Sequence, residues 1–132
     1  MSDDALAKVA GYLERFAQER DLALPPLDQG VARIQRGSAV VSVHVLHQQG
    51  VLLYLARVAA APAPGDEARL RQLLTASFTT TGDAAFALHP ETGEVYLRIL
   101  RSIDGLDYDE FEDLLHTIAT VADDWDDRLK AS

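Results

Sequence analysis

Acidic side chains near the end of the chain are the groups whose type and spacing first suggest chemistry. Asp123, Asp124, Asp126 and Asp127 crowd a short stretch in which carboxylate oxygens could gather around a cation. The loop pattern of a calcium site, with ligands at fixed positions and a glycine for the turn, is absent. We therefore interpret the cluster as a solvated acidic surface, which is where most such residues lie in proteins.

The histidines do not have the spacing of a metal site. His44 and His47 lie three residues apart on a predicted strand, so they would point to opposite faces of the sheet. His89 and His116 lie far from them in the sequence. The chain has no cysteine, which excludes a disulfide, a thiolate zinc site and a thiol nucleophile. We expect no metal and no cofactor.

Catalytic motifs are also missing from the sequence. No serine stands in the turn context of a nucleophile elbow, and no glycine-rich phosphate loop occurs. Neighbouring carboxylates occur only where solvent should surround them, so shifted pKa values are not implied there. We expect a protein that is not an enzyme.

Charge and hydropathy restrict the partners. The formal net charge is −9 and the pI is about 4.7, a surface that nucleic acid backbones would repel. The longest apolar run, 51–61, is interrupted by Arg57 and is shorter than the ~18 residues of a membrane span. No basic and then apolar secretory signal is visible at the start. We expect a cytoplasmic protein with basic or amphipathic protein segments as partners, and neither nucleic acid nor membrane.

The elements that would position these groups centre on residues 94–129. Val95, Leu97 and Ile99 alternate with Glu94, Tyr96, Arg98 and Leu100, a period of two that is typical of a strand with at least one buried face. Asp107 and Glu110 have capping-box spacing at the start of a helix of about 35 Å that reaches residue 129. One stripe of this helix is apolar: Phe111, Leu114, Leu115, Ile118, Ala119, Ala122, Trp125 and Leu129.

The rest of the chain predicts two helices and four strands. The helices are expected at 2–20, with Ser2 as its cap, and from 65 to about 78; the strands are expected at 31–35, 39–46, 51–58 and 84–88. The strand at 51–58 is apolar on both faces, as in a strand covered on two sides. The order α-β-β-β-α-β-β-α over one domain, 1–132, predicts an α+β fold with helices packed on a twisted antiparallel sheet.

More apolar surface is present than one sheet and three helices need to bury. We expect the excess to form a partner surface, first of all a homodimer interface on the second helix and the following strand. The interface residues would be Leu70, Leu73, Leu74, Phe78, Phe86 and Leu88.

The sequence resembles the class I type III secretion chaperones, the Tir-chaperone-like family. The similarity rests on residues 73–77, on 88–97 with its sequence LHPETGEVYL, on 105–107 and on 122–125, and the predicted strands of 43–58 agree with it. The resemblance implies a homodimer that is not an enzyme and that holds an extended N-terminal segment of a secreted effector until export. An alternative is a sensor or regulatory domain similar to the YbjN-type proteins, which would bind a folded partner.

The first helix and the first strand are the expected place for an extended client. The strand at 31–35 is short, contains Arg33 and is followed by Arg36; such charges at a sheet edge usually prevent indiscriminate strand pairing. A sheet edge can accept a client as an added strand. In the resembling family the stripe of the first helix lies beside it; that stripe could instead be core. The predicted effector-binding residues are Leu6, Val9, Leu13, Phe16, Val31 and Arg33.

Overall fold

The computed structural model has the predicted order of elements. It describes residues 2–131, and the side chains of residues 4–130, so the proposed cap by the Ser2 side chain lies outside the described side chains. The elements are α1 (Ser2–Glu19), β1 (Val31–Arg36), β2 (Ala39–Leu46), β3 (Val51–Ala59), α2 (Glu67–Thr79), β4 (Ala85–Leu88), β5 (Val95–Ser102) and α3 (Tyr108–Ala131). The α+β class is confirmed, and each predicted element lies within a few residues of its expected position.

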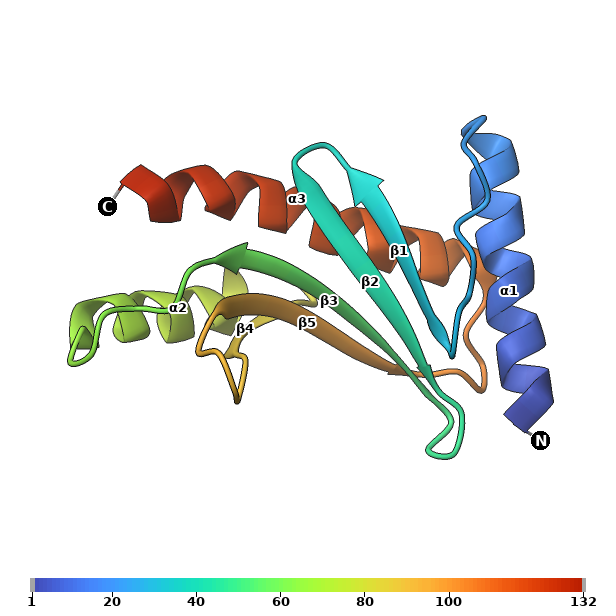
Figure 1. The fold of residues 1–132 in the computed structure, drawn as a ribbon, viewed down its shortest axis with the longest axis horizontal. Coiled ribbons are helices and arrows are strands. Elements are labelled where there is room, and N and C mark those ends of the chain that lie inside the picture. Colours follow the sequence, from blue (N-terminus) through green and yellow to red (C-terminus); the bar gives the residue numbers. More distant parts are fainter. Residues whose placement is uncertain (1, 132) are drawn as a thin grey trace.

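The five strands form one antiparallel sheet in the order β1-β2-β3-β5-β4 (Figure 1). The short turns at Gly37 and Gly50, both with positive φ, connect β1, β2 and β3 as a meander. The chain then leaves through α2 and returns as β4 and β5, with β5 inserted beside β3. Consequently β1 and β4 are the sheet edges, and the prediction that the first strand is an edge is confirmed.

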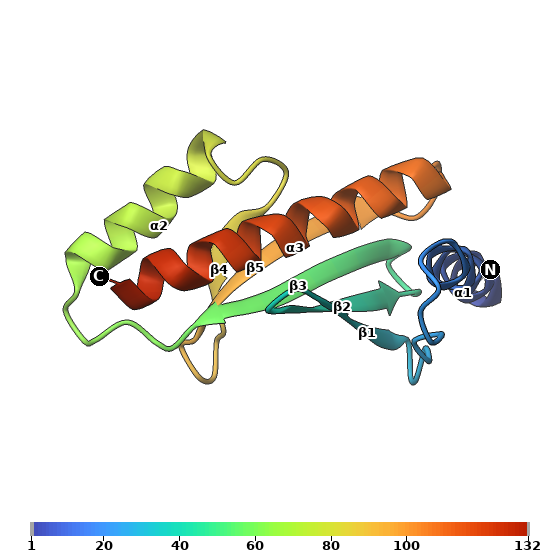
Figure 2. The ribbon, with the colours of Figure 1, turned by 90° about the horizontal axis from the view of Figure 1, so that it is seen from above.

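Helices cover only one face of the sheet (Figure 2). The side chains that β3 directs to this face are buried, whereas Val51, Leu53 and Leu55 on its other face are half-buried and Arg57 is exposed. The expectation that this strand is covered on two sides is therefore wrong. Its second apolar face remains open to solvent or to a partner.

The long helix α3 forms the centre of the core. The Asp107 carboxylate accepts a hydrogen bond from the backbone N–H of Glu110 at 2.8 Å, as the predicted cap requires, while the Glu110 carboxylate lies 3.9 Å from Arg101. The whole predicted apolar stripe of α3 is buried. At its far end Trp125 packs edge-on against Phe86 of β4, with ring centroids 5.2 Å apart.

Polar contacts fix α1 to the start of α3. The Tyr12 hydroxyl donates to the Leu106 carbonyl at 2.7 Å, and the Tyr108 hydroxyl donates to the Glu19 carboxylate at 2.8 Å. The Arg20 guanidinium pairs with Glu112 at 2.6 Å. These contacts lie in the second half of α1 and at the residue that follows it, and they attach this end of the helix to the start of α3.

Candidate protein-binding surfaces

Buried polar groups in this chain are satisfied by structural hydrogen bonds. Tyr54, on β3, is buried under α3 and donates to the Phe111 carbonyl at 3.1 Å, and burial raises the pKa of its hydroxyl. Thr81, also buried, donates to the Ala84 carbonyl at 2.5 Å. Among the described residues no buried side-chain nitrogen or oxygen lacks a partner, and no group of three metal-ligating side chains occurs. Two surfaces of the described residues have the apolar character that could bind protein.

None of the helices in the described part of the chain has the length and apolar character needed to cross a bilayer.

The first of these surfaces lies on α2 and the end of β4, and we call it the α2–β4 patch: Leu70, Leu74, Phe78 and Leu88. All four side chains are exposed, with Leu74 at 71% and Phe78 at 88% of their full accessible area. Leu70, Leu74 and Phe78 follow one another at intervals of four, so they form a single stripe of the helix. An apolar stripe this exposed is uncommon on a monomer surface and indicates a partner.

The opposite face of α2 attaches the helix to the fold. The Asp66 carboxylate caps the helix by accepting from the Arg69 backbone N–H at 3.0 Å, and Leu73 and Ala76 are buried. Ser77 accepts from the backbone N–H of Phe86 at 2.9 Å, which joins α2 to strand β4. The helix is thus held in place by one face while the α2–β4 patch remains uncovered.

Two of the six predicted dimer residues belong to the core. Leu73 and Phe86 are buried, and they form with Leu70, Leu74 and Leu88 the wall of an apolar hollow of about 200 Å³. The other four are the exposed members of the α2–β4 patch. The sequence stripe could not separate these groups, because both faces of this short helix carry leucine.

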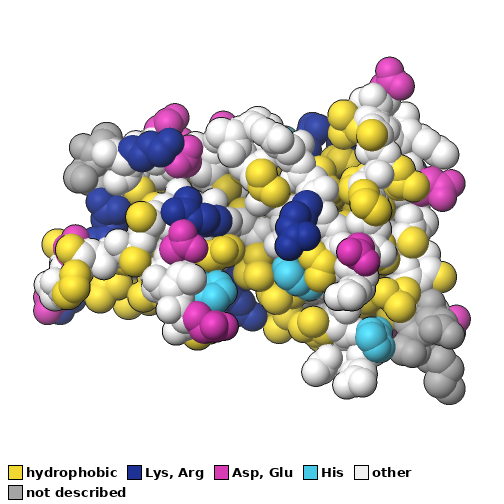
Figure 3. All heavy atoms as spheres, in the orientation of Figure 1, with side chains coloured by type: hydrophobic (Ala, Val, Ile, Leu, Met, Phe, Trp, Pro, Cys, Tyr) yellow, Lys and Arg dark blue, Asp and Glu magenta, His cyan; other side chains and the backbone are white. Residues whose placement is uncertain are grey.

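The second surface is the face of the sheet that no helix covers, which we call the open sheet face. Figure 3 looks onto it and shows hydrophobic side chains lying among basic, histidine and some acidic side chains. Val40 and Leu100 are its most exposed large apolar residues. Its exposed polar side chains are Arg33, Gln35, Arg57, Arg98 and Ser102. The following are half-buried: Val31, Ser42, His44, Leu46, Val51, Leu53, Leu55, Ala85, Ala87 and Tyr96.

The outer edge of β1 adjoins the open sheet face. Asp28 occupies part of this edge, since it exchanges backbone hydrogen bonds of 2.9 and 3.0 Å with Val31. Backbone groups alternate in direction along a strand, so those of Arg33 and Gln35 point outward from the sheet as those of Val31 do. These groups could pair with an added strand.

The structure separates the six predicted effector-binding residues. Val9, Leu13 and Phe16 are buried, so it favours the core interpretation for these three, and Leu6 is half-buried against the same core. Val31 is half-buried and Arg33 exposed at the β1 edge. Contact of any of the six with an effector stays a prediction.

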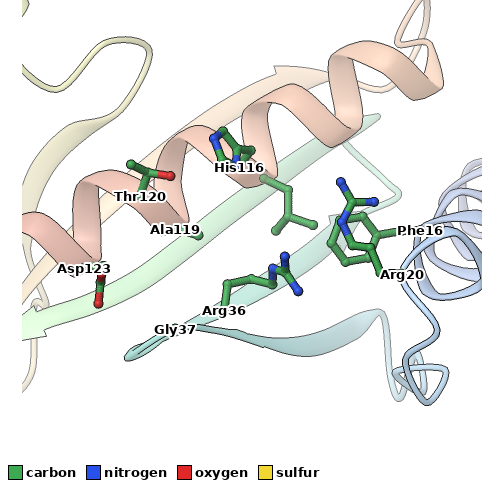
Figure 4. A pocket seen from close by; sticks show the side chains of 9 residues that line it. Phe16, Arg20, Arg36, Gly37, His116, Ala119, Thr120 and Asp123 are labelled. Carbon is green, nitrogen blue, oxygen red and sulfur yellow. The ribbon is translucent and has the colours of Figure 1, made fainter.

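A pocket of about 220 Å³ opens where α1, α3 and the β1–β2 turn meet (Figure 4). Its floor includes Phe16 and its rim carries the guanidinium groups of Arg20 and Arg36, which lie 4.0 and 5.6 Å from the Phe16 ring centre. Asp123, on the same rim, accepts hydrogen bonds from the backbone N–H and hydroxyl of Ser38. The pocket offers apolar and charged contacts to a side chain, and His116 and Thr120 of α3 also line it.

The contact of Asp123 with Ser38 gives the acidic cluster a structural role that its sequence did not reveal. Asp124 and Asp126 pair with Arg128 and Lys130 one helical turn later, at 3.1 and 3.3 Å. The last turn therefore offsets part of the repulsion among the aspartates. The helix spacing of these pairs was visible in the sequence, whereas the Asp123 contact spans 85 residues and was not.

Charge near the β1 edge affects one histidine. His44 lies on the open sheet face with its Nε2 at 2.8 Å from the Ser42 hydroxyl. Partial burial, and then the positive charge of Arg33, lower the pKa of His44 below its ordinary value of 6.5. On the same face Arg57 binds Glu94 at 2.6 Å, and this hydrogen bond lowers the pKa of the Glu94 carboxyl.

Comparison with solved structures identifies the architecture. The chain is similar to a structure of the ExsC–ExsE complex at 28% identity and a TM-score of 0.72, over 91% of this chain and 92% of the other. It is also similar to the ExoU–SpcU complex from the type III secretion system of Pseudomonas aeruginosa, at 19% identity and a TM-score of 0.65, over 87% and 92%. YbjN from E. coli shares the fold at 12% identity and a TM-score of 0.56, over 83% and 85%.

Because a YbjN-type protein shares the fold, architecture alone does not separate the two interpretations of the sequence. No curated protein matches the sequence closely enough to decide between them. The family model of the Tir chaperone protein (CesT) family, however, matches residues 11–126, which include all five strands, α2, half of α1 and most of α3. The chain belongs to the Tir chaperone protein (CesT) family.

Proposed function

We propose that this protein is a chaperone that binds an extended N-terminal segment of a secreted effector and keeps it competent for export. The observation that carries the proposal is the family match over residues 11–126. The solved relatives agree with it, since the ExsC–ExsE and ExoU–SpcU structures are complexes of two proteins. The proposal also includes action in the cytoplasm, where a segment would be held before export, and no catalytic step.

The working unit in this proposal is a homodimer formed through the α2–β4 patch. A two-fold interface presents the same patch from each subunit, so Phe78 and Leu74 of one copy would meet the same stripe of the other. Burying Phe78, which is 88% exposed, would remove one of the largest apolar side chains from water. A stable interface would bury about 1,600 Å² in total.

The client in this proposal pairs with the β1 edge. An unfolded segment has unpaired backbone groups and alternating side chains, and the outward groups of Arg33 and Gln35 with the adjacent open sheet face can satisfy both. Asp28 occupies the Val31 end of this edge, which leaves the part from Arg33 to Gln35 for the client. The buried positions Val9, Leu13 and Phe16 act in support, by holding α1 in place.

The experiment is co-purification of the tagged protein from its own cells, followed by limited proteolysis of the complex. We expect a partner whose N-terminal segment is cleaved when free and protected when bound. Protection confined to a folded domain of the partner would contradict the proposal and would favour a YbjN-like regulatory role.

The dimer is tested separately, by light scattering of Phe78→Glu. We expect the mass of a monomer at micromolar concentration, with an unchanged circular dichroism spectrum because Phe78 is exposed. Arg71→Glu, on the same helix but outside the patch, is the control and should keep the dimer mass. A monomer mass for the unmodified chain would refute the interface.

A further inference from the structure

The strands of this acidic protein carry no acidic residue. The chain has 21 aspartates and glutamates, yet none lies within β1, β2, β3, β4 or β5. The exposed charges that the strands present on the open sheet face are Arg33, Arg57 and Arg98. The open sheet face is therefore apolar and basic, although the net charge of the whole chain is −9.

Two of these arginines, Arg33 and Arg98, form no ion pair with the described residues of this chain. Arg57 is paired with Glu94 at 2.6 Å. Neither Arg33 nor Arg98 has a carboxylate within ion-pair distance among the residues that the structure describes. After partial burial, Arg33 is the second cause of the lowered pKa of His44, which lies on the neighbouring strand of the same face.

The sheet register places the two free arginines at the ends of one row. Arg33 pairs with Ser42, Ser42 pairs with Leu55, and Leu55 pairs with Arg98. The row thus runs straight across β1, β2, β3 and β5. Three strand spacings of about 4.8 Å separate its ends by about 14 Å at the backbone.

This distance matches a period of extended chain. A segment in β conformation rises about 3.4 Å per residue, so side chains at positions i and i+4 lie on the same side about 14 Å apart. If such a segment lay across the strands, its residue i would lie at Arg33 and its residue i+4 at Arg98. Its residue i+2 would then lie between Ser42 and Leu55. The neighbouring row, Val31, His44, Leu53 and Leu100, adds apolar contact beside the middle position.

We infer that the open sheet face selects a client segment with the pattern acidic–x–apolar–x–acidic, bound across the strands between Arg33 and Arg98. The inference rests on the proposed chaperone function and specifies the chemistry of one part of its client, which crosses the strands and is distinct from the part that pairs along the β1 edge. The two carboxylates pair with the terminal arginines, and the apolar side chain covers Leu55. Such a pairing also explains why both charges remain uncompensated inside this chain.

The test uses labelled, end-capped synthetic peptides and fluorescence anisotropy at low ionic strength. The first peptide has the centre Glu-Thr-Val-Thr-Glu, and the second replaces both glutamates by lysine. The third, Thr-Glu-Val-Glu-Thr, keeps composition and charge but halves the spacing of the acids. Two exposed ion pairs in place of two repulsions should favour the first peptide over the second by about tenfold. The third should bind more weakly than the first, and the preferences should shrink as salt is raised.

Charge reversal on the protein supplies the decisive comparison. In the double variant Arg33→Glu with Arg98→Glu, the lysine peptide should bind more tightly than the acidic one. The double variant Arg33→Gln with Arg98→Gln should bind both peptides equally. It keeps the test decisive if the charge-reversed variant does not fold. Arg128→Glu, on α3, changes the net charge by the same amount as one reversal and should leave the order of the peptides unchanged. Thermal melting should show that all variants fold, since both strand arginines are exposed.

Any one of the following results would overturn the inference: equal binding of the acidic and lysine peptides, no effect of acid spacing, or an unchanged order in the charge-reversed variant. Absence of binding by every peptide at millimolar concentration would also overturn it. If the native complex nevertheless shows a protected N-terminal segment, the chaperone function stands and only this client pattern is wrong. If no such segment exists but the peptides rank as expected, the surface is real and its role as a chaperone site is wrong.

Discussion

Replacing Trp125 by alanine tests whether the far end of α3 is anchored as the structure indicates. Trp125 is the only tryptophan, it is 5% exposed, and its ring meets Phe86 edge-on at 5.2 Å. An aromatic side chain buries about 150–250 Å². At about 25 cal/mol per Å² this area corresponds to about 4–6 kcal/mol, an upper estimate because alanine keeps part of the burial. Measured truncations of buried aromatic residues cost about 3–5 kcal/mol, and we expect Trp125→Ala in this range.

The assay is urea and thermal unfolding followed by circular dichroism, since the substitution removes the tryptophan fluorescence. For 132 residues a loss of 1 kcal/mol lowers Tm by roughly 3–4 °C, so the expected decrease is about 9–20 °C. Trp125→Phe keeps an aromatic ring against Phe86 and should cost clearly less. Protein concentration must be matched, because a dimer would couple stability to concentration. A loss below about 1 kcal/mol would refute the buried anchor and would make Trp125 a candidate partner contact.

Three further substitutions test local features. Asp107→Ala should lower the free energy of unfolding by about 0.5–2 kcal/mol, because the Glu110 N–H loses its acceptor; Asp104→Ala, in the preceding turn, is the control in the same urea titration. Tyr54→Phe should cost about 0.5–1.5 kcal/mol through its hydrogen bond to the Phe111 carbonyl, and a neutral result would mean that the bond is not formed in solution. Because the folded-state pKa of His44 is lowered, the unfolded chain takes up a proton first, and stability should fall as pH falls through about 6.5. His44→Gln should flatten this dependence in melting curves, whereas His47→Gln, on the exposed β2–β3 turn, should not.

Local patterns in the sequence were sufficient to predict the helices and strands and their order. Alternation defined residues 95–100 as a strand, and helical spacing placed Trp125 and Leu129 on the buried stripe of α3. The cap at Asp107 followed from the side chain three positions later. These features depend on neighbours in sequence, and period and capping chemistry describe such neighbours directly.

Surfaces were harder to predict because a stripe of apolar residues does not say what covers it. Leu73 and Leu74 are adjacent in the sequence, yet one is buried against the fold and the other is 71% exposed. In α1 the stripe through Val9, Leu13 and Phe16 could have been core or recognition surface, and its burial depends on contacts such as that of Tyr108 with Glu19, 89 residues away. Tertiary packing determines such long-range contacts, and the local periodicity of the sequence does not predict them.

Net charge alone does not specify the charge of the surface that a partner meets, for a related reason. A charge of −9 favoured basic segments as partners, but net charge is an average over the whole surface. The acids of this chain lie on helices, turns and loops, whereas the strands contribute Arg33, Arg57 and Arg98 to the open sheet face. A segment approaching that face meets its local charge first, since charges beyond about 10 Å are largely screened at ordinary salt.

The two candidate surfaces lie on opposite sides of the sheet, which bears on how they could work together. Leu88 pairs with the buried Val95 and Phe86 pairs with the buried Leu97, so these β4 side chains point to the helix-covered side. Arg98, the next residue of β5, points to the open side. A dimer formed through the α2–β4 patch would therefore leave both open sheet faces uncovered. Each dimer could then present two separate rows from Arg33 to Arg98 to one extended client, and binding at the second row would gain from tethering at the first without any new kind of contact.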